Sequence, residues 1–333
     1  MTRPRVCWLT PDKPANISVG RQRIAAHLDE QGFEVVLRGT TLATFGHLLA
    51  DREGFDAVIG TTRAGAVAGA LLSILKNCPL LVDHVDPISQ FEGTASRPVA
   101  AVVRWLENAA FALAAGVLYT YPEEYARVSR FARRVKKTDL GVEFDRFTDP
   151  SPEAIRAAED RLAGLEDDPE NRIAIYLGGL EPIYHIEELL ASARYLENWT
   201  LLVVGDGSLS EVVERAAEER ESIEFLGSVP HEAVPGYLRV ADVGICLVDD
   251  PHTLKVLEYG AADLPVVQLA GRAEKRFDDL VEFSTTDPGD VARAIESAGE
   301  RSDDQEHPLR AFASRFDWAR VATDYEGMLE DVL

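Results

Sequence analysis

Residues 243–268 read VGICLVDDPHTLKVLEYGAADLPVVQ and contain, in order, a strand, a turn, a helix and a second strand. The apolar runs at 243–247 and 265–268 are typical of strands that are buried on both faces, and 253–262 between them reads as a helix. Asp250 followed by Pro251 suits a helix start, with Asp as N-cap and Pro at the first helical position. This segment therefore predicts a βαβ unit in a parallel sheet.

The same alternation continues along the chain in both directions. Strands are expected at 6–10, 33–38, 56–60, 80–85 and 117–120, and again at 172–177, 200–204, 223–226, 243–247 and 265–268. Helices are expected at 21–30, 64–76, 99–115 and 123–134, and again at 186–195, 209–219, 253–262, 290–298 and 309–333. The pattern predicts two doubly wound α/β domains in tandem, because such alternation builds parallel sheets.

An acidic, proline-rich segment interrupts the alternation and marks the domain boundary. We predict a first domain at 1–150, an acidic linker at 151–171, a second domain at 172–308 and a closing helix at 309–333. Ligands of doubly wound folds lie at the carboxyl ends of the strands. We therefore expect the site in the cleft between the two domains.

Composition narrows the class of protein. The 333 residues are 46% hydrophobic, enough for real cores. No apolar run approaches the roughly 20 residues that span a bilayer, and the N-terminal apolar stretch is too short for a signal peptide. We therefore expect a cytoplasmic protein, either soluble or peripheral on the inner face of the membrane.

The charge is strongly acidic and unevenly placed. The formal net charge is −23, residues 1–147 hold 18 basic and 16 acidic side chains, and residues 148–333 hold 16 and 41. Only six of the basic residues are Lys, and a Lys-poor acidic surface indicates a high-salt organism. A nucleic-acid partner is excluded, because phosphate contacts need a basic footprint. The three Cys and seven His residues show no metal-ligand spacing, so we expect no metal and no disulfide scaffold.

Lys255 and Glu258 are three residues apart and therefore lie on one face of the predicted helix. A helix N-terminus offers free N–H groups and a positive dipole to a diphosphate, and Lys255 adds a cation one turn in. Glu258 can accept hydrogen bonds from two vicinal hydroxyls, as on a ribose. The same spacing also fits a capped surface helix with an ion pair.

Asp250 and Glu258 are eight residues apart and precede Gly260-Ala-Ala-Asp-Leu-Pro265-Val-Val. In this respect the segment resembles the nucleotide-sugar site of GT-B glycosyltransferases, especially the retaining family-4 type. The resemblance implies that Glu258 binds the donor ribose, that Asp250 lies near the transferred sugar and that Lys255 lies near the phosphates. It also implies the GT-B fold: two Rossmann-like domains facing across a cleft, with a C-terminal helix crossing back toward the first domain.

Other segments resemble that family in the same order. They are YLGGLEP at 176–182, LLVVGDG at 201–207, FLGSV at 225–229, GVE at 141–143 with Phe147, and FDW at 316–318. By this resemblance the donor would also be bound by Gly178, Gly179, Gly205, Gly207, Ser228 and Val229. Glycines that follow strands permit tight turns and a close backbone approach; each also fits a plain strand-end turn.

The chain departs from the family pattern at one point. The family places an Arg just after the first-strand glycine and a Lys a few residues later, both aimed at the donor phosphates. Here those positions are Gly179 or Leu180 and Tyr184, which carry no charge. Diphosphate binding would then rest on Lys255, on helix N-termini or on a distant Arg.

The first domain offers its own candidates at strand ends. Asp83-His84-Val-Asp86 ends a strand, and His84 or Asp86 could polarise an acceptor hydroxyl as a base. The alternative is a polar strand-end loop. Gly20 in the loop after the first strand, and Arg63 at a later strand end, each lie at a helix start that could hold an anion.

The segment YARVSRFARRVKK, residues 125–137, has helical apolar spacing and a dense basic face. The basic residues are Arg127, Arg130, Arg133, Arg134, Lys136 and Lys137. The face is either the solvated side of a core helix or a dock for anionic lipid, which a lipid-linked acceptor would explain.

Taken together, the residues and the resemblance predict a glycosyltransferase that moves a sugar from a nucleotide diphosphate sugar to an acceptor. The acceptor would be a lipid-linked saccharide in glycoprotein or surface-glycan synthesis. The reaction would need no metal and no cofactor, and it would retain configuration if the family-4 type holds. Two alternatives stay open: a non-catalytic nucleotide-sugar-binding or scaffold homologue, and a nucleotide-sugar epimerase of the same fold.

Overall fold

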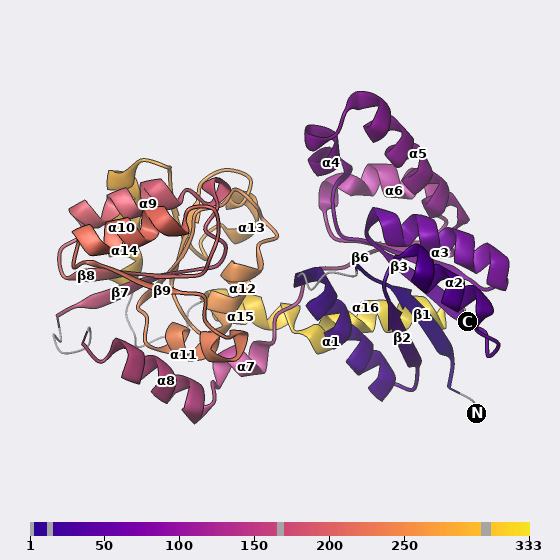
Figure 1. Ribbon diagram of the computed structural model, residues 1–333, viewed down its shortest axis with the longest axis horizontal. Helices are drawn as coiled ribbons and strands as arrows, with labels where there is room; N and C mark the ends of the chain where they lie inside the picture. Colours follow the sequence, from indigo (N-terminus) through magenta and orange to yellow (C-terminus); the bar gives the residue numbers. More distant parts are fainter. Residues whose placement is uncertain (1–2, 12–15, 165–169, 301–307) are drawn as a thin grey trace. The chain divides into compact units, whose positions relative to one another are not determined.

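The computed structural model describes residues 3–11, 16–164, 170–300 and 308–333. The chain forms two compact units: unit 1 consists of Met1–Gly141 and Trp318–Leu333, and unit 2 of Val142–Asp317 (Figure 1). Each unit has one six-stranded sheet with helices on both faces. The α/β class and the two doubly wound domains predicted from the sequence are confirmed.

Every strand pair in unit 1 is parallel, in the order β2-β1-β3-β4-β5-β6. The strands are β1 Arg5–Leu9, β2 Glu34–Arg38, β3 Ala57–Thr61, β4 Leu80–His84, β5 Gly116–Tyr119 and β6 Val135–Lys137. The helices are α1 Asn16–Glu30, α2 Leu42–Ala50, α3 Thr62–Lys76, α4 Ile88–Thr94, α5 Arg97–Leu113, α6 Tyr125–Phe131 and α16 Trp318–Glu330. The strand order reverses between β1 and β3, which is where such folds bind ligands.

Unit 1 has a separate apolar core on each face of its sheet. Trp8 and Ile59 face one side with α1 and α16, whose buried residues include Ile24 and Tyr325. Alternate strand residues face the other side with α2, α3, α5 and α6. Burial of both faces explains why the strands read as continuous apolar runs rather than as alternating patterns.

Unit 2 is likewise all parallel, in the order β12-β11-β10-β7-β8-β9. Its strands are β7 Arg172–Leu177, β8 Trp199–Val204, β9 Ile223–Gly227, β10 Val243–Cys246, β11 Val266–Leu269 and β12 Glu282–Ser284. Its α-helices are α7 Phe144–Thr148, α8 Pro152–Leu162, α9 Ile186–Ser192, α10 Ser210–Glu219, α11 Val234–Arg239, α12 Leu254–Ala261, α13 Glu274–Phe277, α14 Pro288–Gly299 and α15 Pro308–Ala313. The order reverses between β7 and β10, so the expected ligand site lies beyond those two strand ends.

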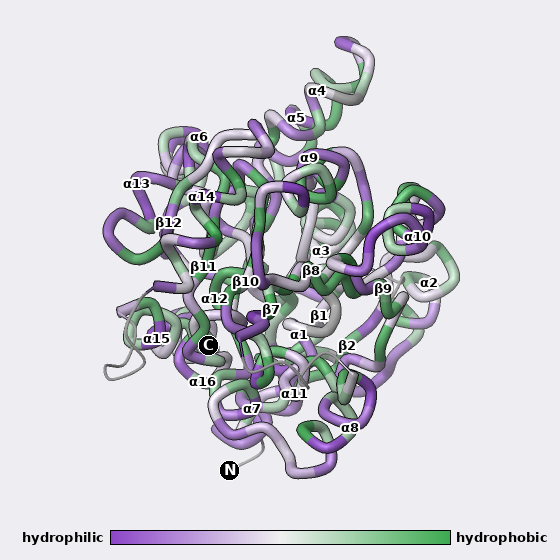
Figure 2. The backbone as a smooth tube through the Cα atoms, turned by 90° about the vertical axis from the view of Figure 1, so that its left-hand side faces the viewer, coloured by the Kyte–Doolittle hydropathy of each residue, from purple (hydrophilic) through white to green (hydrophobic). Residues whose placement is uncertain are grey.

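The helices of unit 2 bury one stripe and expose another. Around α10 the tube alternates between hydrophobic and hydrophilic residues (Figure 2). Val213 of α10 is fully buried in the core that α9 and α14 share. The 3.6-residue period recognised in the sequence therefore gives each helix its packing face.

Three predicted boundaries are wrong. The predicted linker 151–171 is not a separate linker: α8 lies within it, and Ala158 and Leu162 are buried in the core of unit 2; its residues 165–169 lie outside the described residues. The first domain does not extend to 150, because Phe147 of α7 is buried in the same core. The closing helix is two helices, α15 in unit 2 and α16 in unit 1, separated by a 3₁₀ turn at Ser314–Phe316.

The basic segment also differs from its prediction. The helix expected at 123–134 ends at Phe131, and Val135–Lys137 form β6 at the edge of the sheet. Within the described ranges, no helix combines the length and the apolar character that crossing a membrane requires.

Candidate functional site

The loops that follow β7, β8 and β9 are hydrogen-bonded to one another. Gly178 N donates to Val204 O at 2.9 Å, and Gly205 N donates to Gly227 O at 2.9 Å. Gly205 has φ +145°, and a Cβ there would overlap the carbonyl of Gly178. A side chain is therefore excluded at Gly205, and the backbone of the loops approaches closely at the carboxyl edge of the sheet.

Gly178 makes room for Lys255. Its φ is +146°, and an added Cβ would lie 2.7 Å from Lys255 Nζ. Lys255 comes from the first turn of α12, which follows β10. The side chain therefore crosses from β10 to the end of β7, which is the switch point of the sheet.

Two tyrosine rings hold the Lys255 ammonium. Nζ lies 4.0 Å from the centroid of Tyr184 and 5.2 Å from that of Tyr176. The Tyr176 hydroxyl donates to Gly179 O at 2.6 Å, which fixes its ring. Among the described residues Lys255 has no carboxylate within ion-pair distance: the two ring faces contact its ammonium directly, and Glu258 acts on it only at longer range. Burial lowers the pKa of the Lys255 ammonium.

The sequence identified Tyr184 only as an uncharged position and did not single out Tyr176. Aromatic residues next to strand-end glycines resemble ordinary core residues, so their pattern carries no functional signal. Their contact with Lys255 becomes visible only in the fold, where the start of α12 lies beside the end of β7.

The start of α12 differs from its prediction. The helix begins at Leu254, with Thr253 as N-cap and no side-chain capping bond, rather than at Pro251. Asp250 does not cap the helix: its Oδ1 accepts a hydrogen bond from His252 N at 2.9 Å. Asp250 therefore lies in the turn after β10, on the strand-end side of the helix.

Glu258 lies one turn after Lys255 on α12 and is partly buried. Burial raises the pKa of Glu258 to about 7, although the Lys255 and Arg146 charges oppose the shift. A carboxylate accepts hydrogen bonds from hydroxyls better than a carboxylic acid does, because both oxygens are then acceptors. Its capacity to bind a diol therefore changes near neutral pH.

This gives a pH prediction. Nucleotide affinity should fall as pH is lowered through about 7, because Glu258 takes up a proton and loses acceptor capacity. Calorimetric titration of a nucleoside diphosphate across that range measures the effect. In Glu258→Gln the affinity should equal that of the unaltered chain below this pKa and be weaker above it, leaving only the pH dependence of the ligand's own terminal phosphate; an unchanged pH profile in that variant would contradict the assignment.

The other predicted donor residues lie on the same edge of unit 2. Gly207 packs against the backbone of Leu180, and Gly179 accepts the bond from Tyr176. Ser228 is exposed after β9, whereas Val229 is half-buried against the core. The structure thus brings Gly178 and Lys255 into contact and leaves Ser228 open to solvent.

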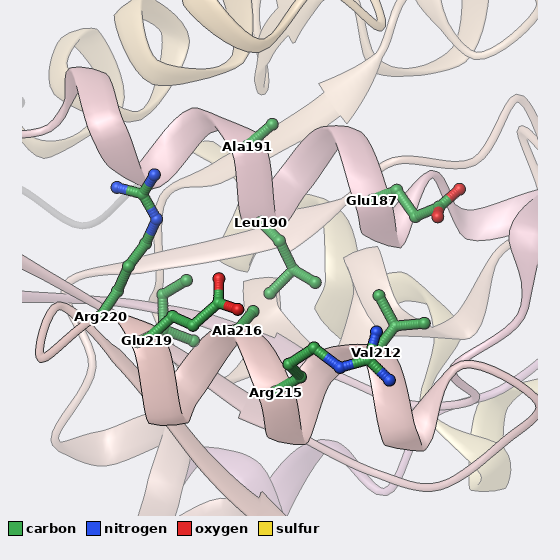
Figure 3. Close-up of a pocket in the computed structure, with 9 residues that line it drawn as sticks. Glu187, Leu190, Ala191, Val212, Arg215, Ala216, Glu219 and Arg220 are labelled. Carbon is green, nitrogen blue, oxygen red and sulfur yellow. The ribbon is translucent and has the colours of Figure 1, made fainter.

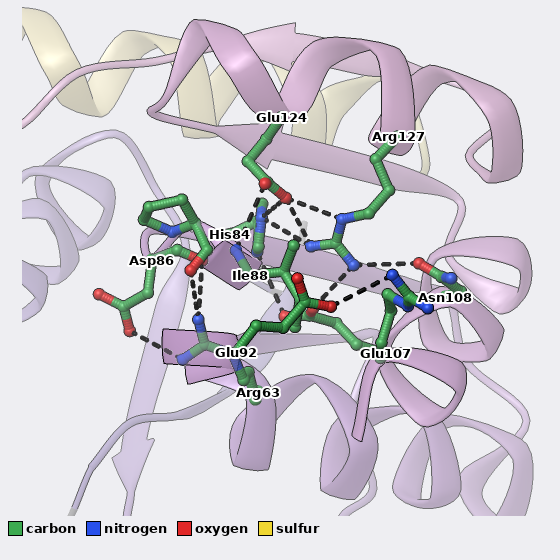
Figure 4. Close-up of polar contacts among 11 residues, drawn as sticks. Arg63, His84, Asp86, Ile88, Glu92, Glu107, Asn108, Glu124 and Arg127 are labelled. Carbon is green, nitrogen blue, oxygen red and sulfur yellow. Dashed lines mark hydrogen bonds and ion pairs between the residues drawn. The ribbon is translucent and has the colours of Figure 1, made fainter. Parts of the chain in front are cut away.

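His84 does not have the arrangement of a free base. It is 2% exposed, its Nε2 lies 2.8 Å from Glu124 and its Nδ1 lies 3.4 Å from Glu107 (Figure 4). Burial alone would lower the pKa of His84, but the hydrogen bonds to Glu107 and Glu124 raise it above its ordinary value. With both nitrogens held by carboxylates, His84 has no lone pair to offer an acceptor hydroxyl, so the predicted role does not fit the structure.

Arg127 belongs to this buried cluster and is not part of a lipid-facing surface. Its guanidinium lies 2.8 Å from Glu107 and 2.6 Å from Glu124 (Figure 4). The Glu124 carboxyl is desolvated, yet its bonds to His84 and Arg127 lower its pKa to about 2. The quartet of His84, Glu107, Glu124 and Arg127 is therefore charge-balanced and ties β4 to α5 and α6.

Asp86 is the more accessible of the two residues, His84 and Asp86, that were predicted to act as a base. It is partly exposed, and burial raises its pKa. Arg63, at the start of α3, has Nη1 3.9 Å from the Asp86 carboxylate and donates from Nη2 to Pro87 O at 2.7 Å. Arg63 thus holds the 86–87 turn at the carboxyl edge of unit 1.

Gly20 allows α1 to pack closely against α16 and does not lie in an open loop. It lies within α1, where a Cβ would overlap the ring of Trp318 in α16. The prediction that Gly20 lines a substrate site is therefore wrong in its local geometry.

Unit 2 also has a groove of about 270 Å³ between α9 and α10 (Figure 3). Its floor contains Leu190 and Val212, and Arg215 and Glu187 lie on its rim. None of its lining residues is a predicted site residue. Among the described residues, no three His, Cys, Asp or Glu side chains gather as a metal site would require.

Residues 171–300 match the family of glycosyl transferases group 1. Unit 2 contains a glycosyl transferases group 1 domain. The match spans β7 to α14 and so includes the Gly178 loop, Lys255 and Glu258.

The whole chain has the GT-B fold. It is similar to Anabaena HepE solved with UDP, with TM-score 0.76, 18% identity, and coverage of 98% of this chain and 100% of that one. It is similar to a Rickettsia africae glycosyltransferase, with TM-score 0.75, 12% identity and coverage of 100% and 99%. It is also similar to WaaG, a glycosyltransferase of lipopolysaccharide biosynthesis, with TM-score 0.65, 15% identity and coverage of 98% and 99%. No curated protein sequence matches this chain.

Proposed function

We propose that the protein transfers a sugar from a nucleotide diphosphate sugar to a lipid-linked saccharide. The observation that carries the proposal is the Lys255 ammonium, which lies at the switch point of unit 2 without an ion-pair partner among the described residues. Glu258 lies on the same helix. A cation and a carboxylate one turn apart suit a diphosphate and a ribose diol respectively. HepE structures with UDP and UDP-glucose support the choice of donor class.

The chemistry follows from where charge develops. When the bond between the sugar and the diphosphate breaks, negative charge grows on the leaving oxygens. Lys255 and the N-terminus of α12 are fixed in place beforehand, so they stabilise that charge without reorganising. Asp250, in the turn before α12, is proposed to contact the transferred sugar. These roles use no metal.

A labelled-donor assay tests the proposal. The purified chain is incubated with a panel of labelled UDP, GDP and TDP sugars and a membrane lipid extract. Label in the lipid phase supports transfer. Conversion of the free donor to another sugar would favour the epimerase alternative, and donor binding without turnover would favour the non-catalytic one.

A lipid-linked acceptor places the protein at a membrane surface. Arg130, Arg133, Arg134, Lys136 and Lys137 are exposed, whereas Arg127 is taken up by the buried quartet. Lys136 and Lys137 pair with Asp324 and Asp139, so Arg133 and Arg134 are the stronger candidates for lipid phosphates.

Reversing those two charges should weaken vesicle binding. Arg133→Glu with Arg134→Glu is expected to lower binding to anionic vesicles by at least about fivefold per residue. Co-sedimentation measures the change. A matched reversal in unit 2, at the exposed Arg215 and Arg220, should leave binding unchanged; equal effects of both pairs would contradict a dock at 133–134.

A further inference from the structure

Helix α5 is apolar on two opposite faces. Ala100, Ala110 and Phe111 are buried on the side that packs in unit 1. On the other side, positions 98, 101, 102, 105, 109 and 112 follow helical spacing and hold Pro, Ala, Val, Trp, Ala and Ala. A surface helix ordinarily carries polar residues on that face, so the second stripe points to a partner.

The second stripe is open to solvent. Val102 is 58% exposed, Trp105 67% and Leu113 55%. We name the exposed residues of this second stripe, together with Leu113 beside it, the α5 ridge: Pro98, Ala101, Val102, Trp105, Ala112 and Leu113. In Figure 1, α4 and the beginning of α5 extend beyond the strands of unit 1, so the sheet does not cover them.

Basic residues flank the ridge. Arg97 and Arg104 are exposed on α5 itself, Arg104 in an ion pair with Glu92 at 3.2 Å, and α6, which packs against α5, leads to the exposed Arg133 and Arg134. Residues 97–137 contain eight basic and three acidic side chains, in a chain of net charge −23. Glu107 and Glu124 are neutralised in the buried quartet, which also takes up Arg127, so seven basic side chains and Glu123 remain outside it. The surface around the ridge is therefore positive.

We propose that α5 lies flat in the headgroup region of an anionic bilayer, with the α5 ridge inserted and the flanking arginines on the lipid phosphates. An apolar stripe bordered by basic residues, with Trp at its centre, suits that boundary. A second copy of the chain fits less well, because a symmetric contact would bring two positive surfaces together. The proposal deepens the proposed function, since a lipid surface presents a lipid-linked acceptor, but the binding step needs no donor.

Tryptophan fluorescence gives a site-specific test. Trp8, Trp199 and Trp318 are 0%, 3% and 7% exposed, so Trp105 is the one tryptophan that a bilayer can reach. Vesicles of phosphatidylcholine with phosphatidylglycerol should shift the emission to the blue and protect it from acrylamide. Brominated acyl chains should quench it. Pure phosphatidylcholine should produce a much smaller response.

Variants locate the contact. Trp105→Ser should lower co-sedimentation with the anionic vesicles by about tenfold or more, and Arg97→Glu with Arg104→Glu by about fivefold per residue. The matched control is Tyr195→Ser, an aromatic residue 50% exposed in unit 2, which should bind as the unaltered chain does. Unaltered binding by Trp105→Ser would overturn the proposal.

Two further outcomes separate this inference from the donor chemistry. If the chain binds UDP and transfers sugar but ignores vesicles, the bilayer proposal fails and the proposed transfer reaction stands. If the chain binds vesicles but neither binds UDP nor transfers sugar, the bilayer proposal stands and the proposed transfer reaction fails. A dimer in sedimentation velocity that Trp105→Ser dissociates, without vesicle binding, would assign the ridge to a second copy instead.

Discussion

Lys255→Met should reduce sugar transfer by about 100-fold or more, since removing one preorganised donor to a developing negative charge commonly has that effect. The side chain is the cation that the structure places between the β7 loop and α12. Its Nζ would lie only 2.7 Å from a Cβ added to Gly178. Methionine keeps most of the length and an apolar contact with the rings of Tyr176 and Tyr184 but removes the charge. Affinity for UDP and turnover should fall together.

The control for this change is Lys275→Met, which removes the exposed lysine of α13 and should leave both quantities unchanged. Circular dichroism checks that each variant is folded. A Lys255→Met enzyme with ordinary affinity for UDP would show that the diphosphate binds elsewhere, and the assignment of the site would fail. Lys255→Arg should rescue little, because the larger guanidinium must fit against Gly178 and two rings.

In the proposed site, the tyrosine pair supports a single cation where the family pattern has an Arg and a Lys. A cation held on aromatic faces keeps its charge without a carboxylate partner, so it stays available to an incoming anion. Burial lowers the pKa of Lys255, and a bound diphosphate would reverse that effect by supplying the missing counter-charge. Nucleotide binding should therefore favour the protonated lysine.

Most strand positions were predictable from the sequence because most strands are buried on both faces. The runs at 172–177 and 243–247 stand out for this reason and lie within a residue of the observed β7 and β10. The edge strand β12, three residues long, was missed, and so was the edge strand β6. The latter is only three residues long, its second and third residues are exposed lysines, and its basic composition resembles the end of a helix.

The site was only partly predictable, because sequence spacing reports neighbours along one element and not across the sheet. Lys255 and Glu258 share a helix face, and this spacing was informative. His84 and Arg127 are 43 residues apart, so their shared cluster became visible only with the fold. Polar residues at strand ends look alike in sequence whether they line a site or satisfy one another.

The second large effect concerns stability rather than chemistry. Asp83, at the end of β4, is fully buried and binds Arg21 of α1 through two bonds of 2.7 and 2.8 Å. Its oxygens also accept hydrogen bonds from Thr61 Oγ1 and Tyr325 Oη, each at 2.7 Å. Because Tyr325 belongs to α16, this cluster fastens the last helix of the chain to the sheet of unit 1.

Asp83→Asn should lower the free energy of unfolding by about 3–5 kcal/mol, because it leaves the Arg21 guanidinium buried without its counter-ion. Asp86→Asn is the matched control three residues along: its carboxylate is partly exposed and lies 3.9 Å from Arg63, so its removal should cost less than about 1 kcal/mol. Urea unfolding followed by circular dichroism compares the two. Tyr325→Phe separates the contributions further, since it removes the hydrogen bonds of Tyr325 Oη to Asp83 and from Arg21 but keeps the ion pair, and about 1–3 kcal/mol is expected. If Asp83→Asn proved as mild as Asp86→Asn, water must reach Arg21 in the folded chain, and α16 would be held to the sheet by its apolar face alone.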